Sequence, residues 1–535
     1  MLDRRFFISA AAGGLLLPST VLAAVQKVVP GAKGAVNIRD FGAKGDGKTI
    51  DSAAIDKAID AASARGGGVV YFPAGTYASY TIHLKSQVTL YLDRGAVLLA
   101  AAVPLEGTTK GGYDMAEPQD PAINEFQDYG HNHWKNSLIY GEGLHDVAIL
   151  GDGLIWGKGL TRDHREDKDL PRANLPGVGC KAIALKNCRN VQLRDFSILQ
   201  GGWFALLATG VDNLTIDNVV VDTNRDGFDI DCCKNVRVSN CTMNSPYDDG
   251  ICPKSSFALG YARSTENVTI SDCFLSGSYV VGTVIDGTYQ RIPEASTYET
   301  GWGKNVGFGR IKCGTESNGG FKNITITNCV FDMSRGIALE TVDGAILEDI
   351  AISNITMRQA TNSPLFLRIG TRMRGPQGVP VGSIKRVLID NITSSAAVQL
   401  PSIICGVTDR PVEDVKISNI YFQQVGGAPA AMAVLNPTPK DNDYPEPNRF
   451  GDLPATGFYI RNTKNLEMSH VEITTVNPDP RPAFFMQNVD GFDGSFLKLP
   501  AGAAGFKLDN VSGFRTFGSR SVPDKRFDTA TTTQF

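Results

Sequence analysis

A short sequence pattern of alternating apolar and polar residues is repeated along most of the chain. Residues 213–219 read NLTIDNV, and residues 323–329 read NITITNC. Val, Leu or Ile alternates with Thr, Ser or Arg, which predicts strands with one buried and one exposed face. The Asn or Asp at each strand break suits a tight corner, because it tolerates left-handed backbone angles. The pattern therefore predicts short strands joined by regular corners.

The copies are spaced like the coils of a solenoid. The copies that begin at Asn190, Asn213 and Asn235 lie 23 and 22 residues apart, about one turn of a parallel β-solenoid. Further copies begin at Asn267, Asn323 and Asp349, with weaker ones at Arg386, Asp414 and Asn465. One coil cannot bury its apolar face alone, but a stack of coils can. A β-sandwich or barrel is the alternative, but such folds join their strands with hairpin turns.

A helix is expected before the first coil. Residues 54, 55, 58, 59 and 62 are Ala or Ile at helical spacing, and three glycines at 66–68 end the pattern. Residues 69–77 then read as a first strand. A helix at this position would shield the open strand edges of the first coil. We therefore expect an N-terminal helical cap.

The first residues indicate an exported protein, and the rest of the chain is interpreted as one long domain. Arg4 and Arg5 precede an apolar run at residues 10–17, which is typical of a bacterial twin-arginine (Tat) signal peptide at 1–23 and predicts a periplasmic location. We assign residues 36–515 to one β-helix domain and 516–535 to a tail. No segment looks long and apolar enough to span a membrane, and we expect a monomer.

The charge balance excludes one class of partner. The formal net charge of −4 becomes about −5 when the signal peptide is removed. This mild negative balance argues against binding to nucleic acid.

The ten cysteines are better interpreted as buried thiols than as a disulfide framework. Cys188, Cys241, Cys273 and Cys329 each follow Asn or Asp at the same phase of the repeat, so they would stack inside the coils. Disulfides stay possible for four of the other six, namely Cys232, Cys233, Cys252 and Cys313. No paired Cys-x-x-Cys spacing indicates a metal site.

Three acids are the strongest candidates for chemistry. Asp226 lies about one coil before Asp248 and Asp249, and equal positions on successive coils stack about 4.8 Å apart. Three carboxylates so close cannot all ionise easily, so one should keep its proton near neutral pH. Arg310 and Lys312 are two residues apart and point to one face of a strand, which suits an acidic substrate.

These motifs resemble a known family. Residues 224–229 (NRDGFD), the Asp248-Asp249 doublet and Arg310-Ile311-Lys312 occur in the order found in glycoside hydrolase family 28, the polygalacturonases and rhamnogalacturonan hydrolases. The similarity covers roughly residues 36–511. It implies an all-β fold, a right-handed, single-stranded parallel β-helix of the pectin-lyase-like type. It also implies hydrolysis of α-linked galacturonic acid with inversion, without a metal or other cofactor.

The resemblance implies a role for each matching residue. Asp248 would be the general acid, whereas Asp226 and Asp249 would position and deprotonate the water. Arg310 and Lys312 would bind the carboxylate of the sugar. An acid and a base with room for water between them are what inverting hydrolysis requires.

The sequence departs from the family at one motif, because it lacks the Gly-His-Gly that usually lies between the doublet and Arg-Ile-Lys. Residues 276–282 (SGSYVVG) stand there, and we expect Tyr279 to supply a hydroxyl instead. Asn224 and Glu316 are further candidates for substrate contact. The departure leaves the sugar open, so rhamnogalacturonan or another acidic glycan is an alternative substrate.

Long insertions at residues 102–134, 161–179, 286–309 and 425–453 interrupt the repeats. Such insertions usually wall a site. They predict cleavage from the end of a chain. Together with the resemblance, this leads us to expect an exo-acting galacturonidase that cleaves an acidic polysaccharide or oligosaccharide. Two other functions remain open on this fold: a calcium-dependent polysaccharide lyase that uses the same acids, and a carbohydrate-binding solenoid without activity.

Overall fold

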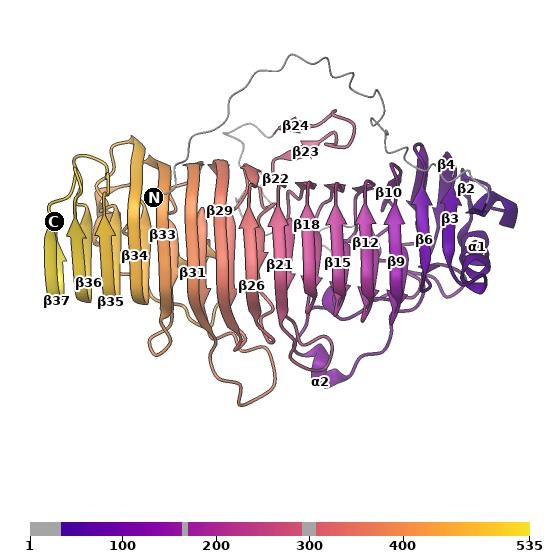
Figure 1. The fold of residues 1–535 in the computed structure, drawn as a ribbon, viewed down its shortest axis with the longest axis horizontal. Helices are drawn as coiled ribbons and strands as arrows, with labels where there is room; N and C mark the ends of the chain where they lie inside the picture. Colours follow the sequence, from indigo (N-terminus) through magenta and orange to yellow (C-terminus); the bar gives the residue numbers. More distant parts are fainter. Residues whose placement is uncertain (1–33, 163–168, 292–306) are drawn as a thin grey trace, which may run out of the picture.

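The computed structural model describes residues 34–162, 169–291 and 307–535, so the predicted signal peptide lies outside the described residues. Most strand pairs are parallel, and each strand pairs with the equivalent strand of the next coil. The chain therefore winds into a right-handed parallel β-helix whose coils stack side by side (Figure 1). The predicted fold class is confirmed.

The strands of the helix form three parallel ladders. Ladder 1, the face labelled in Figure 1, contains β3 (Gly68–Phe72), β6 (Val88–Leu92), β9 (His145–Leu150), β12 (Arg189–Arg194), β15 (Asp212–Asp217), β18 (Lys234–Ser239), β21 (Thr265–Ser271), β26 (Phe321–Thr327), β29 (Ile346–Ala360), β31 (Ser383–Ala396), β33 (Val412–Gly426), β34 (Phe458–Asn477), β35 (Phe484–Ser495) and β36 (Phe506–Phe517).

Ladders 2 and 3 close the coil. Ladder 2 contains β2 (Asp46–Ile50), β4 (Gly75–Ser79), β7 (Ala96–Ala100), β10 (Leu154–Trp156), β13 (Ser197–Leu199), β16 (Val220–Asp222), β19 (Thr242–Asn244), β22 (Phe274–Ser276) and β27 (Val330–Asp332), and continues into β29. Ladder 3 contains β5 (Ile82–His83), β8 (Ile139–Glu142), β11 (Lys181–Lys186), β14 (Phe204–Thr209), β17 (Asp226–Asp231), β20 (Ile251–Lys254), β25 (Ile311–Cys313), β28 (Ile337–Thr341), β30 (Leu365–Ile369) and β32 (Ser402–Cys405), and continues into β34.

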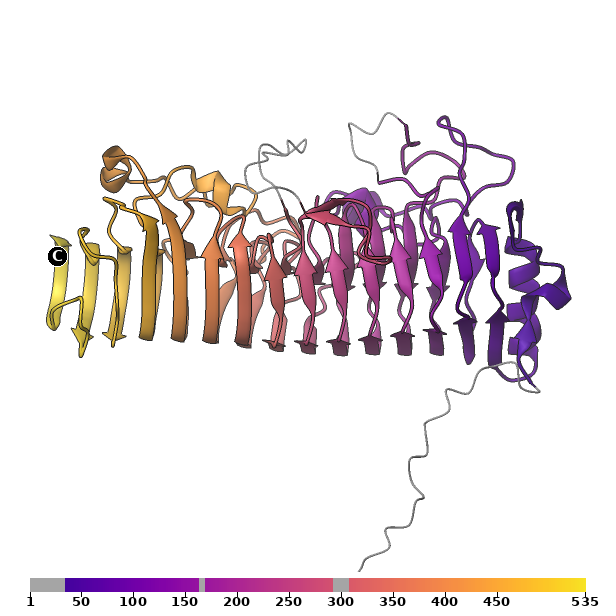
Figure 2. The ribbon, with the colours of Figure 1, turned by 90° about the horizontal axis from the view of Figure 1, so that it is seen from above.

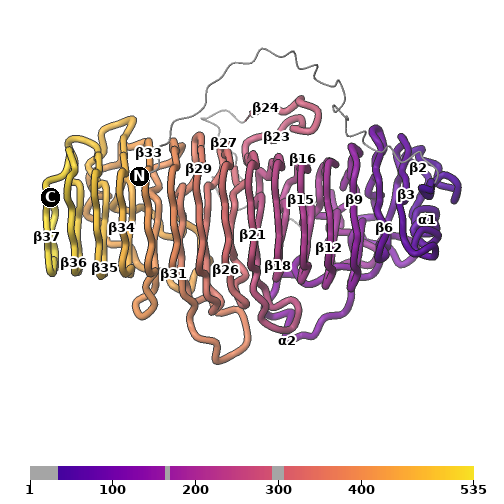
Figure 3. Tube along the Cα trace, in the orientation of Figure 1, coloured from indigo at the N-terminus to yellow at the C-terminus, as the bar shows by residue number. Residues whose placement is uncertain are grey.

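The corners of the coil use left-handed asparagines, as the repeat predicts. Asn213, Asn235 and Asn267 have φ angles of 55°, 58° and 58°. Each amide donates a hydrogen bond to the asparagine of the preceding coil, at 2.8 Å from Asn213 and 3.1 Å from Asn235. These side chains form a polar ladder that fixes the register of the coils stacked in Figure 3.

The interior of the coil is apolar, and the cysteines are part of it. All ten cysteines are buried and free. The prediction of stacked thiols is confirmed for Cys241, Cys273 and Cys329, since Cys273 interacts with the other two. It is wrong for Cys188, which precedes β12 and therefore lies at a different corner of the coil, in line with Cys233. Burial raises the pKa of the Cys233 thiol. These side chains therefore act as small apolar residues.

The N-terminal end is covered by α1 (Ser52–Ala64), whose Ile55, Ala58, Ile59 and Ala62 are fully buried. The predicted cap is present, but it is preceded by β1 (Val36–Asn37), η1 (Ile38–Phe41) and β2. The expected first strand at 69–77 is split into β3 and β4 by a break at Pro73–Ala74. The sequence pattern missed these segments because stretches of two to five residues are too short to show a periodicity.

The C-terminal end is covered by β37 (Lys525–Gln534), which pairs antiparallel with β36. The residues predicted as a tail thus continue the sheet in the opposite direction. Among the described residues, no helix is long and apolar enough to cross a bilayer.

The long insertions all lead into strands of ladder 3. They precede β8, β11, β25 and β34, and two of them stand out on one side of the solenoid in Figure 2. We call residues 101–138 the first insertion and residues 427–457 the fourth insertion. Their short elements are α2 (Pro121–Asn124), η2 (Tyr129–His131), η3 (Ala430–Val434) and η4 (Pro447–Phe450); the hairpin of β23 (Tyr279–Val281) and β24 (Gln290–Arg291) precedes β25.

Candidate functional site

The three predicted acids lie at the beginning of neighbouring strands of ladder 3. Phe228 of β17 pairs with Ile251 of β20, and Ile251 pairs with Ile311 of β25; all three point into the core. This register places Asp226 beside Asp249, and the amide of Gly227 donates to the carbonyl of Asp249 at 3.0 Å. Asp226 therefore aligns with the second Asp of the doublet, and Asp248 lies one position earlier. The site combines all three acids, as the spacing predicts.

Asp249 lies between the two predicted cations. Its Oδ1 accepts a hydrogen bond from Arg310 Nε at 2.5 Å, and its Oδ2 contacts Lys312 Nζ. Burial works to raise the pKa of Asp249, but Arg310 and Lys312 outweigh it and hold the pKa below the ordinary value. Asp249 is therefore ionised. The two cations that the sequence assigns to the substrate carboxylate are already engaged with a carboxylate of the protein.

The pKa values of Asp226 and Asp248 are shifted in opposite directions. Burial raises the pKa of Asp226 well above its ordinary value, and the charges of Asp248 and Asp229 add to the effect. Burial also works to raise the pKa of Asp248, but the Arg225 guanidinium and Lys312 lower it below its ordinary value. Asp248 accepts a side-chain hydrogen bond from Asp226. Of the three carboxyls, Asp226 is therefore the one whose surroundings favour the protonated form.

A buried charge network continues from the acids toward the ends of the strands. Lys254 Nζ donates to Glu316 Oε2 at 3.0 Å and lies 3.9 Å from Asp229. Glu316, a predicted substrate residue, is held ionised: burial opposes this, but Lys254, His131 and Arg372 lower its pKa well below the ordinary value.

His131 enters this network from the first insertion. Its Nε2 lies 3.4 Å from Asp229 and 3.8 Å from Glu316. The ring nitrogens of His131 and the carboxylate oxygens of Asp229 are buried without a hydrogen-bond partner among the described residues. Buried polar groups normally have partners, so this position suits the hydroxyl groups of a bound ligand. The sequence placed His131 only in an insertion, because nothing in its spacing connects it to the acids.

The fourth insertion places Glu446 behind Arg310. Glu446 accepts hydrogen bonds from Arg310 at 3.2 and 2.9 Å, from Arg335 at 2.6 Å and from Asn362 at 3.1 Å. The hydroxyl of Tyr444, in the same insertion, accepts from Thr315 at 3.0 Å, while much of this residue is exposed. Neither residue carries a sequence signal, because both lie in an aperiodic segment.

Glu340 is a fully buried carboxyl. It lies on β28, next to Gly314, and neither of its oxygens has a hydrogen-bond partner among the described residues. Burial raises its pKa to about 7, although Lys312 and Arg310 oppose this.

Two predicted substrate residues lie at the margin of the cluster. The hydroxyl of Tyr279 donates to Asp332 at 3.0 Å, which directs it toward ladder 2 and Arg291 rather than toward the three acids. The side chain of Asn224 faces Arg162. Their proposed contacts with substrate remain predictions.

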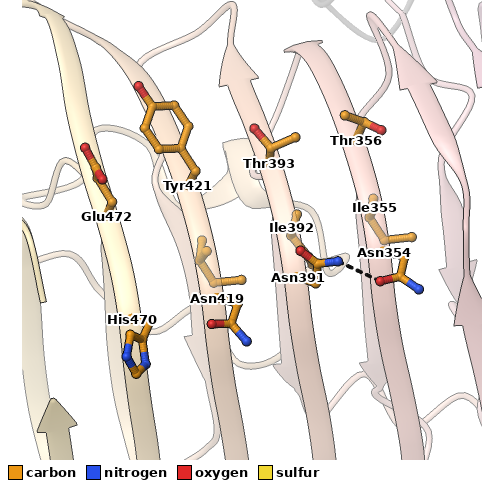
Figure 4. Close-up of a pocket in the computed structure, with 11 residues that line it drawn as sticks. Asn354, Ile355, Thr356, Asn391, Ile392, Thr393, Asn419, Tyr421, His470 and Glu472 are labelled. Carbon is orange, nitrogen blue, oxygen red and sulfur yellow. Dashed lines mark hydrogen bonds between the residues drawn. The ribbon is translucent and has the colours of Figure 1, made fainter. Parts of the chain in front are cut away.

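An open hollow on ladder 1 is separate from this site. It is formed by β29, β31, β33 and β34, and Figure 4 shows the side chains along it. Its lining repeats from coil to coil, with Asn354, Asn391 and Asn419 in one row and Thr356, Thr393 and Tyr421 in another. The hollow is a product of the repeat, and none of the candidate acids lines it.

Comparison with known families matches two parts of the chain. Residues 90–277 match the model described as glycosyl hydrolases family 28, and residues 35–106 match one described as rhamnogalacturonase A/epimerase, pectate lyase-like. The first match includes Asp226, Asp248 and Asp249 but ends before Arg310.

Individual relatives agree with this match. The chain is 26% identical over 413 residues to a probable polygalacturonase of Vitis vinifera, covering 71% of this chain and 72% of that protein. It is 31% identical over 199 residues to an exo-poly-alpha-D-galacturonosidase of Dickeya chrysanthemi, covering 37% of this chain and 29% of that protein. The exopolygalacturonase of Thermotoga maritima has the same fold, with a TM-score of 0.54, 16% identity, and coverage of 94% and 95%.

Proposed function

Since the chain belongs to glycosyl hydrolase family 28 and is a glycoside hydrolase, we propose that it removes galacturonic acid from the ends of α-linked pectic chains, with inversion. The observation that carries this proposal is the register of β17, β20 and β25. It gathers three carboxyl groups and places Asp249 between Arg310 and Lys312. The relatives whose names include galacturonosidase or polygalacturonase support the choice of sugar.

The roles follow from exposure and charge. The Asp248 side chain is 24% exposed, whereas that of Asp249 is 1% exposed, so Asp248 is the carboxyl that can reach a glycosidic oxygen. Asp248 gives a proton to that oxygen as the bond to C1 breaks. A water molecule attacks C1 from the opposite face and loses its proton to ionised Asp249, or to Asp226 once Asp226 has given up its own proton. Inversion follows from this single displacement.

Arg310 and Lys312 supply the positive potential for a uronic acid. Asp249 and Glu446 use three of the five N–H donors of Arg310, so donors remain for a sugar carboxylate. Glu316, Tyr279 and Asn224 complete the proposed set of substrate contacts. Because two cations already neutralise Asp249, calcium ligation by the same acids is unfavourable, which disfavours a lyase.

Exo-cleavage is supported by the two insertions that reach the acids' neighbours. His131 of the first insertion contacts Asp229, and Glu446 of the fourth insertion contacts Arg310. Because both insertions place side chains next to the catalytic acids, they favour a site that is closed at one end and binds the end of a sugar chain. We further propose that residues 1–23 direct export to the periplasm and that the enzyme acts as a monomer.

The deciding experiment incubates the enzyme with polygalacturonate, galacturonate oligomers and rhamnogalacturonan fragments. Proton NMR should show β-galacturonate as the first product from α-linked chains, and chelators should leave the rate unchanged. Monosaccharide should appear before the viscosity of the polymer falls. An unsaturated, ultraviolet-absorbing product would establish a lyase, and early loss of viscosity would refute exo-cleavage. Faster cleavage of rhamnogalacturonan would reassign the substrate.

A further inference from the structure

Arg225 precedes β17 and lies between Asp248 and Trp203. Its Nε and Nη2 both donate to the same oxygen of Asp248, at 3.3 and 3.1 Å, and its Nη1 donates to the carbonyl of Arg162 at 3.4 Å. The guanidinium carbon lies 4.7 Å from the centre of the Trp203 ring. The Arg225 side chain is 19% exposed, whereas that of Arg310 is 2% exposed and that of Lys312 is 3% exposed. Of these three cations, Arg225 is the one that solvent reaches best.

The contact between Arg225 and Asp248 is weak enough for another carboxylate to displace Asp248 from Arg225. A guanidinium binds a carboxylate most strongly when two N–H groups meet two oxygens, at about 2.7–2.9 Å. Here both N–H groups share one oxygen at longer distances. The aromatic face of Trp203 supports the plane of Arg225 and leaves its edge directed toward the acids. A substrate carboxylate that approaches this edge can form the two-oxygen contact.

The charges around Asp248 determine where the proton of the site lies. Arg225, Lys312 and the hydrogen bond from Asp226 favour the ionised form of Asp248, whereas burial and the charge of Asp249 disfavour it. Arg225 itself also interacts with Asp226 and with Asp128 of the first insertion. While Arg225 holds Asp248, the surroundings of the two carboxyls favour a proton on Asp226. A general acid must carry a proton, so Asp248 is not ready for catalysis in the free protein.

We propose that Arg225 recognises the carboxylate of the leaving-group sugar and thereby releases Asp248, which then takes the proton of Asp226. The inference rests on the proposed function, which supplies a substrate with a carboxylate on each sugar. The Asp226 O–H bond breaks and an Asp248 O–H bond forms, leaving Asp226 ionised. Asp248 passes this proton to the glycosidic oxygen, and ionised Asp226 is available to orient the attacking water. Arg225 thus makes acid formation depend on an anionic leaving group.

The test compares two substrates that differ in the leaving group. Digalacturonate releases an anionic sugar, whereas a 4-nitrophenyl α-galacturonide releases a group without a carboxylate. In Arg225→Gln, KM for digalacturonate should rise about tenfold to a hundredfold, the loss expected for a charge-assisted hydrogen bond. The kcat/KM for the aryl substrate should change less than about threefold, and the basic limb of its pH profile should move to higher pH. Equal losses on both substrates, or an unmoved pH profile, would overturn the proposal.

Two variants control for structural damage. Arg225→Lys keeps the charge but not the planar fork, so digalacturonate should lose less than in Arg225→Gln while the aryl substrate stays near the parent rate. Arg194→Gln removes another arginine paired with an aspartate, Asp217, on the exposed face of ladder 1 and should change neither substrate. An Arg225→Lys variant as impaired as Arg225→Gln on the aryl substrate would contradict the assigned role.

A binding measurement separates this inference from the proposed function. If the parent protein hydrolyses neither substrate, the proposed function fails. Calorimetric titration with trigalacturonate then decides recognition alone: affinity about tenfold weaker in Arg225→Gln than in the parent and in Arg194→Gln supports the role of Arg225. Equal affinity in all three proteins refutes it.

Discussion

Buried charge is what the individual residues of this site have in common. The pKa values of Asp226 and Glu340 are raised, mainly because these carboxyls are buried. Asp248 and Asp249 have lowered pKa values because arginine and lysine neighbours outweigh their burial. A cluster in which some carboxyls stay protonated and others stay ionised can provide both an acid and a base.

Replacing the proposed acid tests this division. In Asp248→Asn the side chain can no longer give a proton to the leaving oxygen, so kcat should fall at least about a hundredfold. Steady-state kinetics on digalacturonate measures the loss, and circular dichroism should show an intact fold. A variant with normal turnover would remove Asp248 from the acid role and shift attention to Asp226.

Glu340 gives a pH dependence with a definite sign. Its pKa is raised to about 7 in the folded protein, so between its unfolded value and pH 7 the folded state binds more protons. The contribution of this group to stability therefore falls as pH rises through that window. Glu340→Gln mimics the protonated form, so the variant should be about 3 kcal/mol more stable than the parent at pH 8 and nearly equal at pH 4.5. Urea unfolding at both pH values measures the difference; a variant less stable at pH 8 would contradict it.

At the scale of elements, the fourth insertion is anchored by one carboxylate. Glu446 joins Arg310, Arg335 and Asn362, which belong to three successive coils. Burial works to raise the pKa of Glu446, but the charges of Arg310 and Arg335 outweigh this effect and lower the pKa below its ordinary value. The insertion and the floor of the site are therefore stabilised by the same contacts.

Neutralising this anchor should affect stability and activity together. Glu446→Gln leaves two buried guanidinium groups without their charged partner, which costs about 3–5 kcal/mol of unfolding free energy. The kcat/KM should also fall, because Arg310 loses the group that orients it. The matched control is Glu472→Gln, which removes an exposed ion pair with Lys498 and should cost less than about 1 kcal/mol. Equal effects of the two substitutions would refute the anchoring role.

The repeated elements can be predicted from the sequence, whereas the contacts made by the insertions cannot. The coils, their asparagine corners, the thiol stack and the grouping of Asp226 with Asp249 follow from a repeat that is visible in the sequence. His131 and Glu446 do not, because each lies in an aperiodic insertion far along the chain from its partners. Arg225 belongs to the quoted NRDGFD motif, but its contact with Asp248 depends on a register of 23 residues that only the structure supplies.

At the scale of the whole molecule, the solenoid needs a cover at each end. β37 pairs with the edge of β36 that would otherwise be free. The centre of the Phe535 ring lies 5.4 Å from that of Phe506 and 5.8 Å from that of Phe514. Without this strand, the last coil would offer unpaired backbone groups and apolar rings to other chains.

Deleting residues 519–535 should therefore cause association. We expect larger species in size-exclusion chromatography with light scattering, together with a lower unfolding temperature. The control is Arg526→Ala, which changes an exposed side chain of the same strand and should elute like the parent. A truncated protein that elutes and unfolds like the full chain would show that β37 does not protect the edge.

The spacing of the asparagine ladder has a consequence for how the chain folds. Most contacts join residues one coil apart, so each new coil closes a loop of similar size, such as the 22 residues between Asn213 and Asn235. The longest step in this ladder, 56 residues from Asn267 to Asn323, is the one that brings Arg310 and Lys312 to the acids. Because closure entropy grows only with the logarithm of loop length, this detour costs about 0.8 kcal/mol more than a plain coil. The solenoid can therefore carry long inserts beside its acids with little change in the free energy of assembly.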